Sequence, residues 1–497
     1  MTASAGAPVN RTERWSAVNW DKAHREVRRL QMRIAKAVEE NKTGKVKALQ
    51  YMLSRSFYAK LLAVKRVTTN KGRKTPGVDG VLWQGARAKW RAVKSLRRRG
   101  YQPQPLWRIY IPKKDGKRKR PLSIPTILDR AMQALYKLAL APAAETTADP
   151  NSYGFREARC CADAVAAAFN ALSKPNSATW VLEGDIRGCY DNISHRWMLE
   201  NIPMDRIVLR KWLQAGYMED DRLYPSRKGT PQGGVISPTL ANMTLDGLER
   251  VVRNAVPRRS RVNFVRYADD FIVTGKSKRL LIKRVKPAIE AFLAERGLQL
   301  SEEKTTITYI KHGFTFLGQD FRKHGQKLHI TPSMESVRLL KRKVTELIRK
   351  HVGAPMEGLV KRLNQTLRGW GYYHRHVVSS EAFSLIDTVV FEQLWRMIRK
   401  RHRKKTAKWL IRNYWSYSKG RKWIFTVKCK IKKSKESRVY RVIRLSMVGI
   451  KRYVKIKAAA NPYDPSHAGY LAKRRNCKES RLLPALSARQ YRARIAA

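Results

Sequence analysis

The chain has 497 residues, of which 43% are hydrophobic, and this is more than one hydrophobic core usually organises. The composition excludes a disordered polyelectrolyte and predicts two or three domains or subdomains. Lys and Arg number 105 against 38 Asp and Glu, a formal net charge of +67 that predicts a polyanionic partner, nucleic acid above all. A ribosomal-type or histone-like protein that only neutralises phosphate is the alternative, but 13 Trp and 20 Tyr favour a folded molecular machine.

The cysteines and the apolar runs indicate in which compartment the protein is expected. Five cysteines show one adjacent pair and no Cys-x-x-Cys spacing, so they predict neither a disulfide framework nor a zinc site: Cys160, Cys161, Cys189, Cys429 and Cys477. The first residues lack an apolar signal core, and no uninterrupted apolar run reaches membrane-spanning length. We therefore expect an intracellular protein that does not bind a membrane.

The first part of the chain predicts helices followed by a basic hairpin. Residues 21–67 have helical spacing, and the loop at 70–80 is dense in Gly, Pro, Lys and Arg. The stretch "WRIYIPKKDGKRKRPLSIP" at 107–125 predicts a β-hairpin that turns at Asp115-Gly116. Its tip suits either a solvated turn or a phosphate clamp, since it carries six basic residues: Lys113, Lys114, Lys117, Arg118, Lys119 and Arg120.

Further along, β-prone segments end in acidic residues. Helices are predicted at 130–144 and in "CCADAVAAAFNALSK", and the β-prone stretch 179–186 ends at Asp185-Ile186. A Gly/Pro-rich loop then runs into an apolar helix at 229–248, and "RVNFVRYADDFIVTG" predicts two strands that meet near Ala268-Asp269. Beyond Thr331 the pattern becomes helical, with apolar stripes among Lys and Arg. Residues 396–435 hold 17 Lys or Arg and no acid, interleaved with aromatic residues, so we expect a helical, strongly basic module there.

The adjacent carboxylates of Asp269 and Asp270 predict a reversal of the chain. In a continuous strand they would face opposite ways, whereas a tight turn projects one or both from the end of a hairpin. Asp185 would lie alongside in an antiparallel sheet. Three clustered carboxylates repel one another and require a cation. Two Mg²⁺ ions roughly 3.5 to 4 Å apart could then drive polymerisation or hydrolysis of nucleic acid.

The order of these motifs resembles the reverse transcriptases, or maturases, of bacterial and organellar group II introns over nearly the whole chain. "TPGVDG" is similar to the N-terminal extension motif, and "YIPKKDGKRKRPLSIPT" to the fingers hairpin. Six further segments resemble the successive palm blocks of this family in their usual order: "SYGFREARCCADAV", "GDIRGCYDNI", "GTPQGGVISPTLAN", "YADDF", "GLQLSEEKT" and "GFTFLG". "LNQTLRGWGYYHR" and "FSLIDTVVFEQLWRMIRKRH" are similar to the thumb and maturase domain.

The resemblance implies an α+β fold: a right-hand polymerase, with fingers and palm built on antiparallel sheet, followed by an α-helical thumb/maturase domain. The expected divisions are an N-terminal helical extension and basic loop (1–80), fingers and palm (81–330), thumb and maturase domain (331–435), and a basic C-terminal segment (436–497), a possible DNA-binding remnant. Only Cys477 follows the last histidine, His467, so we expect no endonuclease with paired cysteines and clustered histidines. The second DNA strand would then be cleaved or primed from elsewhere.

The resemblance also implies roles for individual residues. Metal would be held by the carboxylates of Asp185, Asp269 and Asp270 and the carbonyl of Ile186. The incoming nucleotide would meet Lys113, Arg120, Gln232 and Tyr190, whose ring would exclude a 2′-hydroxyl where many relatives carry Phe. Gly233, Arg156 and Arg159 would lie near the nascent pair and template. Lys304 could protonate leaving pyrophosphate, or be a plain surface lysine. Asp191, Asn192 and Ser237 are expected to hold loops in place.

The expected function is that of an RNA-directed DNA polymerase that binds its group II intron RNA as a splicing maturase and supports mobility by target-primed reverse transcription. Lys404, Lys405 and Lys408, in the basic stretch, are expected to bind RNA. Other expected partners are DNA target, primer and dNTPs, in the bacterial cytosol or nucleoid, and the oligomeric state stays open. One alternative is a polymerase-inactive splicing scaffold, against which the three aspartates argue. Another is a reverse transcriptase of a different retroelement, such as a diversity-generating one.

Overall fold

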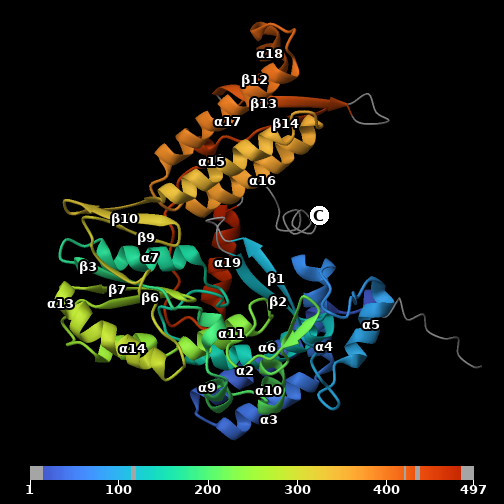
Figure 1. Cartoon of the computed structure of the whole chain (residues 1–497), viewed down its shortest axis with the longest axis vertical. Coiled ribbons are helices and arrows are strands. Elements are labelled where there is room, and N and C mark those ends of the chain that lie inside the picture. Colours follow the sequence, from blue (N-terminus) through green and yellow to red (C-terminus); the bar gives the residue numbers. More distant parts are fainter. Residues whose placement is uncertain (1–14, 113–118, 419–420, 431–436, 483–497) are drawn as a thin grey trace, which may run out of the picture. The chain divides into compact units, whose positions relative to one another are not determined.

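The computed structural model describes residues 15–112, 119–418, 421–430 and 437–482. The chain divides into two compact units, each described by itself. Unit 1 comprises Met1–Ala164, Leu182–Ile307 and Ile456–Ala497, and unit 2 comprises Val165–Val181 and Thr308–Lys455. Helices and strands both contribute to each unit, which agrees with the expected α+β class (Figure 1).

Helices at the start of unit 1 pack around α6 (Ile127–Thr147). Around it lie α2 (Trp20–Glu39), α3 (Thr43–Arg55), α4 (Phe57–Thr69) and, on α4, α5 (Gly85–Ser95). The side chain of Asn19 caps α2 by accepting the Lys22 amide at 2.9 Å, which satisfies a donor that the helix leaves unpaired. The predicted helical character of 21–67 is therefore confirmed.

The predicted basic hairpin forms, although its tip lies outside the described residues. Strands β1 (Leu106–Pro112) and β2 (Lys119–Ile124) pair antiparallel, with Ile111 opposite Arg120. They join β4 (Tyr217–Glu219) and β5 (Arg222–Tyr224) in a sheet of order β2-β1-β4-β5. The tip residues 113–118, which include Lys113, are outside the described part of the chain.

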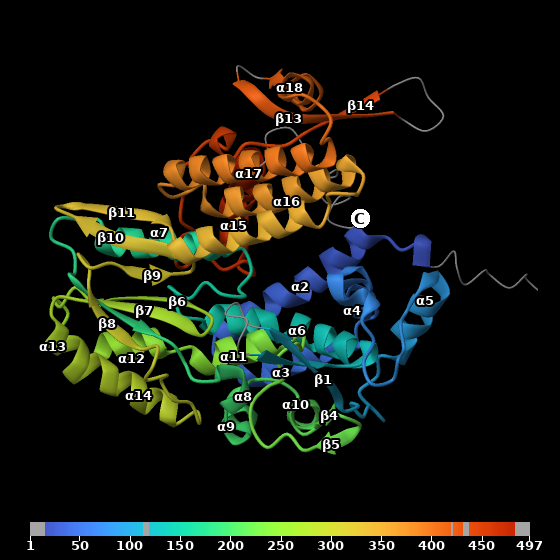
Figure 2. The same cartoon turned by 45° about the horizontal axis from the view of Figure 1, so that its top comes forward.

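A second sheet carries the acidic motifs. Its order is β6-β7-β3-β8, with bounds Asn263–Tyr267, Asp270–Gly275, Trp180–Gly184 and Thr306–Tyr309 in that order. Helices α12 (Leu248–Asn254) and α14 (Lys286–Ala294) lie together beside it (Figure 2). Shorter helices connect these elements: α8 (Cys189–Asn192), α9 (His195–Asn201), α10 (Arg206–Leu213), α11 (Ser237–Leu245) and α13 (Lys278–Leu280).

The end of the chain returns to unit 1 as a segment that we call the C-terminal strap, residues 456–475. It leads into α19 (Ala468–Leu482). Asp163, which is completely buried, accepts hydrogen bonds from the Ile456 amide at 2.8 Å and from Arg474 at 2.5 Å. Tyr463 is buried beneath the guanidinium of Arg28, 4.7 Å from its ring centre. The strap is therefore part of the core of unit 1.

Unit 2 contains a small sheet and three long helices. The sheet has the order β11-β10-β9, formed by Lys327–Pro332, Gln319–His324 and Phe314–Phe316. The helices are α15 (Met334–Arg349), α16 (Met356–His374) and α17 (Ser380–Arg401). Their apolar stripes form one core, as the periodicity predicted.

The expectation of helices throughout 396–435 is wrong for residues 415–430. After α18 (Ala407–Tyr414) the chain forms an antiparallel sheet of β12 (Trp415–Ser418), β13 (Arg421–Lys430) and β14 (Ser437–Arg441). Aromatic and β-branched residues from Trp423 to Val427 suit a pleated surface better than a helix. Ile424, Phe425 and Val427 are buried, so β propensity and burial outweighed the charge pattern.

Candidate active site

The paired aspartates lie at a tight turn, as predicted. Strands β6 and β7 pair antiparallel with Tyr267 opposite Asp270, which leaves only Ala268 and Asp269 to reverse the chain. Ala268 adopts a left-handed conformation with φ of +59°, which is uncommon for a residue with a Cβ atom. Because the chain reverses here, the side chain of Asp269 no longer follows the alternation of side chains along a strand. Asp270 is exposed at the first position of β7.

Asp185 follows the end of β3, the strand next to β7. The residue before it, Gly184, packs against the ring of Phe271, and a Cβ atom at Gly184 would overlap that ring. A glycine is therefore required for β3 to approach β7 so closely at this point. This approach brings Asp185 to the turn that carries Asp269, and its side chain is 18% exposed.

Asp185 lies close enough to Asp269 for its charge to act on that carboxyl group. Burial is the main cause that raises the pKa of Asp269, and the negative charge of Asp185 raises it further. The positive charges of Arg120 and Lys304 oppose this shift. Nζ of Lys304 lies 2.6 Å from Oδ2 of Asp185. The structure thus gathers two carboxylates and two cations from widely separated parts of the sequence.

The oxygen donors at this turn fit a hard divalent cation. Among the described residues no group of three or more His, Cys, Asp and Glu is arranged to hold a metal ion. Mg²⁺, however, is commonly held by one or two carboxylates together with substrate phosphates, and the two coupled carboxylates supply this set. The bridge between Ile186 and Leu300 uses the Asp185 carbonyl and the Arg187 amide, so the Ile186 carbonyl takes no part in it.

Two of the predicted nucleotide-binding residues, Arg120 and Tyr190, lie near the same turn, whereas Lys113 is outside the described residues. Burial and then the charge of Asp269 raise the pKa of Tyr190, while Arg120 opposes them, so both residues lie within electrostatic reach of the aspartate. Tyr190 is fixed through its carbonyl, which accepts the Thr230 amide at 2.6 Å. Gln232 accepts the Ser123 amide at 2.7 Å through its own carbonyl, which ties its loop to β2.

The three polar residues expected to hold loops do so. Asp191 accepts a hydrogen bond from the Gln232 side-chain amide at 3.0 Å. Asn192 donates to the Arg187 carbonyl at 3.0 Å, and the hydroxyl of Ser237 accepts from that of Thr230 at 3.0 Å. Their roles in loop structure are confirmed, and Gly233, exposed with φ of +120°, completes the loop beside Gln232.

Arg156 and Arg159 were expected near the template, yet the structure places both in the protein interior. The guanidinium of Arg156 is bidentate to Glu145, at 3.0 and 2.7 Å, and its side chain is 6% exposed. Arg159 donates to the carbonyls of Ala458 and Ala460 at 3.0 and 3.2 Å. The N–H donors of both arginines are therefore used in contacts with Glu145 and the C-terminal strap. A template would reach these arginines only if those contacts opened.

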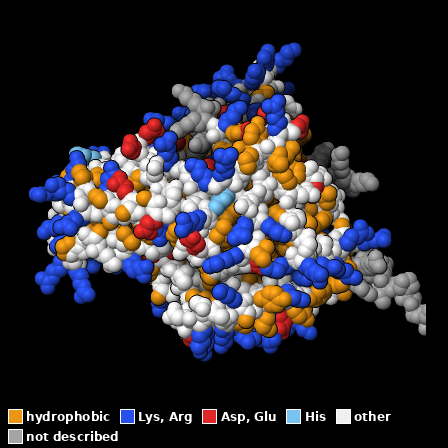
Figure 3. Space-filling view, turned by 60° about the horizontal axis from the view of Figure 1, so that its bottom comes forward, with side chains coloured by type: hydrophobic (Ala, Val, Ile, Leu, Met, Phe, Trp, Pro, Cys, Tyr) orange, Lys and Arg blue, Asp and Glu red, His pale blue; other side chains and the backbone are white. Residues whose placement is uncertain are grey.

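Two cavities lie in unit 1, and they differ in character. The larger, of 1120 Å³, lies between α2, α4, α6 and the strap and has many basic side chains in its wall: Arg25, Arg28, Lys65, Arg66, Lys137, Arg156 and Arg475. Burial, followed by the charge of Arg66, lowers the pKa of Lys137 to about 8. Glu145, Glu157 and Asp246 also line this basic cleft, but the basic side chains outnumber them, and the excess of positive charge suits a phosphate backbone. Figure 3 shows Lys and Arg across much of one face and few acidic side chains.

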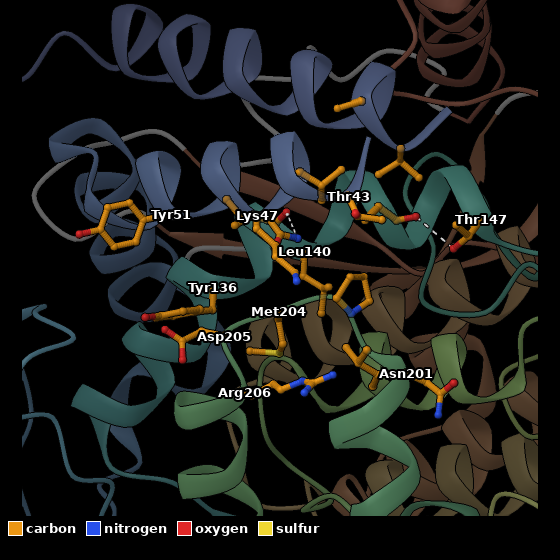
Figure 4. Close-up of a pocket in the computed structure, with 18 of the residues that line it drawn as sticks. Thr43, Lys47, Tyr51, Tyr136, Leu140, Thr147, Asn201, Met204, Asp205 and Arg206 are labelled. Carbon is orange, nitrogen blue, oxygen red and sulfur yellow. Dashed lines mark hydrogen bonds between the residues drawn. The ribbon is translucent and has the colours of Figure 1, made fainter. Parts of the chain in front are cut away.

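The second cavity, of 740 Å³, lies between α3, α6 and residues 200–206 (Figure 4). Its wall is mainly apolar around Tyr51, Tyr136 and Met204, and Asp205 is already paired with Arg98. None of the predicted site residues lines it.

In unit 2 the predicted RNA-binding lysines are accessible. Lys404, Lys405 and Lys408 are exposed just before and within α18. Nζ of Lys405 lies 5.4 Å from the ring centre of Trp409, a cation–π contact at the surface. Their exposure leaves these lysines accessible to a nucleic acid.

A buried arginine beside the turn that carries Asp269 was not among the residues predicted from the sequence. Arg266, in β6, is fully buried and donates to Asn242, Asp246 and the carbonyl of Ala268. A charged residue within the apolar run "NFVRYADDFIV" was the available signal, because a strand rarely buries a guanidinium without a specific set of acceptors.

Comparison with known proteins identifies the family. Residues 111–321 match the family model of reverse transcriptase (RNA-dependent DNA polymerase), 15–96 that of the N-terminal domain of reverse transcriptase, and 337–415 that of the group II intron maturase-specific domain. Protein YkfC of Escherichia coli is 30% identical over 301 residues, which cover 52% of this chain and 79% of that protein. The chain belongs to the group II intron reverse transcriptase and maturase family.

Other relatives extend the comparison of this group II intron family member. The group II intron-encoded protein LtrA of Lactococcus lactis is 29% identical over 362 residues, which cover 58% of this chain and 59% of LtrA. The chain thus spans about three fifths of the length of that relative. A structure of telomerase from Candida albicans with a telomeric RNA fragment is 12% identical with a TM-score of 0.37, covering 63% of this chain and 64% of that one, too low a score to establish a shared fold.

These matches bear on two broader expectations. The reverse transcriptase match and the α+β architecture with antiparallel sheets support the expected polymerase fold, and the family to which that match belongs generally uses a divalent metal. Across the described part of the chain, no helix combines the length and apolar character that a membrane crossing requires.

Proposed function

We propose that this protein is an RNA-directed DNA polymerase that also acts as the maturase of a group II intron. The observation that carries the proposal is the convergence of Asp185 and Asp269 at one turn, within residues matched to reverse transcriptases. The same chain carries the maturase-specific match at 337–415, and this favours the intron type of enzyme over other retroelements.

Asp185, Asp269, Asp270 and the Ile186 carbonyl would hold magnesium, two ions in the full complex. Magnesium supplies activation of a primer hydroxyl and neutralises charge on the leaving phosphate. Lys304, bonded to Asp185, would deliver a proton to pyrophosphate. The positive charges of Arg120 and Lys304 would favour the carboxylate form of Asp269, which is the form that binds a metal ion.

The neighbouring residues would bind the nucleotide and exclude wrong substrates. Arg120, whose charge reaches Asp269, would meet the triphosphate together with Lys113 from the hairpin tip. Tyr190 would block a 2′-hydroxyl, while Gln232 and Gly233 would lie against the nascent base pair. The hydrogen bond from Gln232 to Asp191 would fix the orientation of the amide before substrate arrives.

The basic surfaces would bind the nucleic acids. The basic cleft and the lysines at 404, 405 and 408 would contact intron RNA, with DNA target and primer bound during target-primed reverse transcription. We assign residues 1–80 to an N-terminal extension, 81–330 to fingers and palm, 331–435 to thumb and maturase domain, and 436–497 to a basic C-terminal segment. The proposed setting is the bacterial cytosol or nucleoid.

Primer extension on an RNA template tests this function. Asp269→Asn should abolish extension, because it removes a metal ligand, and should leave intron RNA binding unchanged, because it removes no basic contact. Glu290→Gln is the matched control: it also turns one carboxylate of unit 1 into an amide, but in an exposed pair with Lys286. Extension by Asp269→Asn at the control rate would contradict the site. Splicing of intron RNA by a wild-type protein that cannot extend a primer would favour the scaffold alternative.

A further inference from the structure

Arg266 is a buried cation directly behind the turn that carries Asp269. It lies in β6, three residues before that aspartate, and its side chain is 0% exposed. Burying a guanidinium costs several kcal/mol by rough estimate, and an apolar residue of similar volume would often serve stability as well. A position in the core alone therefore does not account for an arginine here.

The guanidinium joins three acceptors, two from α11 and its C-terminal end and one from the turn. Nη1 donates to the carbonyl of Ala268 at 3.4 Å and to Oδ1 of Asn242 at 3.2 Å. Nη2 donates to Oδ1 of Asp246 at 2.6 Å. A planar fork with several donors suits this arrangement, whereas a lysine ammonium presents a single point charge on a flexible stem. Ala268 is the left-handed residue of the turn, so the fork holds the carbonyl of the residue at which the chain reverses.

Two further segments support the turn from behind. Nδ2 of Asn242, in α11, donates to the carbonyl of Gly154 at 2.7 Å. Gly154 packs so closely on the turn that a Cβ atom there would overlap the amide of Ala268. The backbone of β6 is also fixed, because the carbonyl of Arg266 accepts the Tyr153 amide at 2.9 Å. The segment around Gly154, helix α11 and β6 therefore meet behind the turn.

The positive charge of Arg266 also acts on Tyr190 and Cys189, which lie near Asp269. It opposes the burial and the negative charge of Asp269 that together raise the pKa of Tyr190. It opposes the same two causes at Cys189, whose pKa is likewise raised. The residue thus combines a mechanical link to the turn with an electrostatic one.

The geometry points to Arg266 as a positioning residue for the catalytic turn. Held by Asn242 and Asp246, its fork fixes the carbonyl of Ala268, keeps the turn in its left-handed form and so presents Asp269 to metal and substrate. This inference rests on the proposed polymerase function, and it extends that function to a residue that touches neither metal nor substrate.

Arg266→Lys tests the role of the fork, since the substitution keeps the charge and removes the branched donors. A shift of about 1 Å in a reacting group can cost about a hundredfold in rate, so we expect kcat to fall by that order. The KM for dNTP should stay the same, and the Mg²⁺ concentration for half-maximal rate should rise severalfold. Hydrogen exchange at residues 267–270 should accelerate by about fivefold, the effect of one lost hydrogen bond. Mn²⁺ binding, followed by electron paramagnetic resonance without substrate, should weaken.

Arg296→Lys is the matched control. Arg296 is also buried in unit 1 and donates to main-chain carbonyls, those of Thr244 at 2.9 Å and Phe292 at 2.7 Å. Its loss should lower the melting temperature without changing the Mg²⁺ dependence or the exchange of the turn. If Arg266→Lys shows only what the control shows, the positioning role is refuted.

Two outcomes separate this inference from the proposed function. If the wild-type protein extends no primer, the proposed function is wrong. Hydrogen exchange at residues 267–270 and Mn²⁺ binding would still test whether Arg266 supports the turn. If Arg266→Lys fails to fold, Asn242→Ala removes one supporting bond and should produce the same changes to a smaller degree. Unchanged exchange and Mg²⁺ dependence in a folded Asn242→Ala protein would overturn the inference.

Discussion

Nζ of Lys304 lies 2.6 Å from Oδ2 of Asp185, although 119 residues separate them in sequence. The contact brings a potential proton donor to the carboxylate where phosphoryl transfer is proposed. It also offsets part of the repulsion between Asp185 and Asp269, because Lys304 lowers the pKa of Asp269 against the larger effect of burial. The lysine could therefore act through its proton or only through its charge.

Lys304→Arg separates these two roles. Arginine keeps the positive charge but does not release a proton at neutral pH, so proton donation predicts a loss of about a hundredfold in kcat for Lys304→Arg as well as Lys304→Gln. A role through charge alone predicts that only Lys304→Gln is slow. Single-turnover incorporation of one dNTP measures the chemical step, and Lys286→Gln, in an exposed pair with Glu290, controls for charge loss. Unchanged rates in both Lys304 variants would return it to a plain surface lysine.

Replacing Lys404, Lys405 and Lys408 by Gln should weaken RNA binding and its dependence on salt. Each lost phosphate contact to single-stranded RNA lowers the slope of log K against log salt by about 0.7, so the triple variant should lose about 2. Fluorescence anisotropy with a labelled RNA over a salt series measures this slope. Lys278, Lys283 and Lys286 replaced by Gln form a control with the same change of charge in unit 1. Equal slopes in the two triple variants would show that the α18 lysines are only solvated.

Asp163→Ala should release the C-terminal strap. The substitution leaves the buried Arg474 guanidinium and the Ile456 amide without their carboxylate, which by analogy with broken buried pairs costs about 3 to 5 kcal/mol. Urea unfolding measures the loss, and limited proteolysis should show new cleavage within 456–475. Asp464→Ala, which removes an exposed cap from residues 465–467, should cost only about 1 kcal/mol. Equal stabilities of the two variants would contradict the anchoring role of Asp163.

Unit 2 should lose stability as the pH falls below about 6.5. His374 is buried between Gln319 Oε1 at 3.1 Å and Ser336 Oγ at 3.0 Å, and burial, then the nearby His376, lower its pKa to about 3. The unfolded chain binds a proton near pH 6.5 that the folded chain does not bind until pH 3. Stability from this group is therefore complete above 6.5 and falls by about 1.4 kcal/mol for each pH unit down to about 3.

His374→Gln should abolish this part of the pH dependence, because glutamine can bond both partners without titrating. Chemical unfolding at pH 7 and pH 5, followed by tryptophan fluorescence, measures the difference. His312→Gln, at an exposed position in the same unit, is the control and should retain the wild-type pH dependence. The same slope in His374→Gln as in the wild type would show that another group is responsible.

Local sequence determined much of the site. The pair of acids inside an apolar run predicted the turn at Ala268 and Asp269, because side-chain alternation leaves no other way to present both carboxylates. Turn residues and strand alternation predicted the hairpin at 107–125, and a period of 3.6 predicted the helices of unit 2. The order of the motifs predicted the family. The turn, the hairpin and the helices depend on interactions between residues close in sequence, and the family depends on the order of motifs along the chain, so the sequence alone was sufficient for each.

Contacts between distant segments decided the rest. The charge pattern predicted helices at 415–430, but burial of Ile424 and Phe425 in a sheet, together with the β propensity of this segment, outweighed that pattern. Arg156 and Arg159 are taken up by Glu145 and by the strap, which arrives about 300 residues later in the chain. The support that Arg266 gives to the turn likewise depends on α11. Which basic side chains remain at the surface and which are buried follows from long-range packing, and composition cannot specify it.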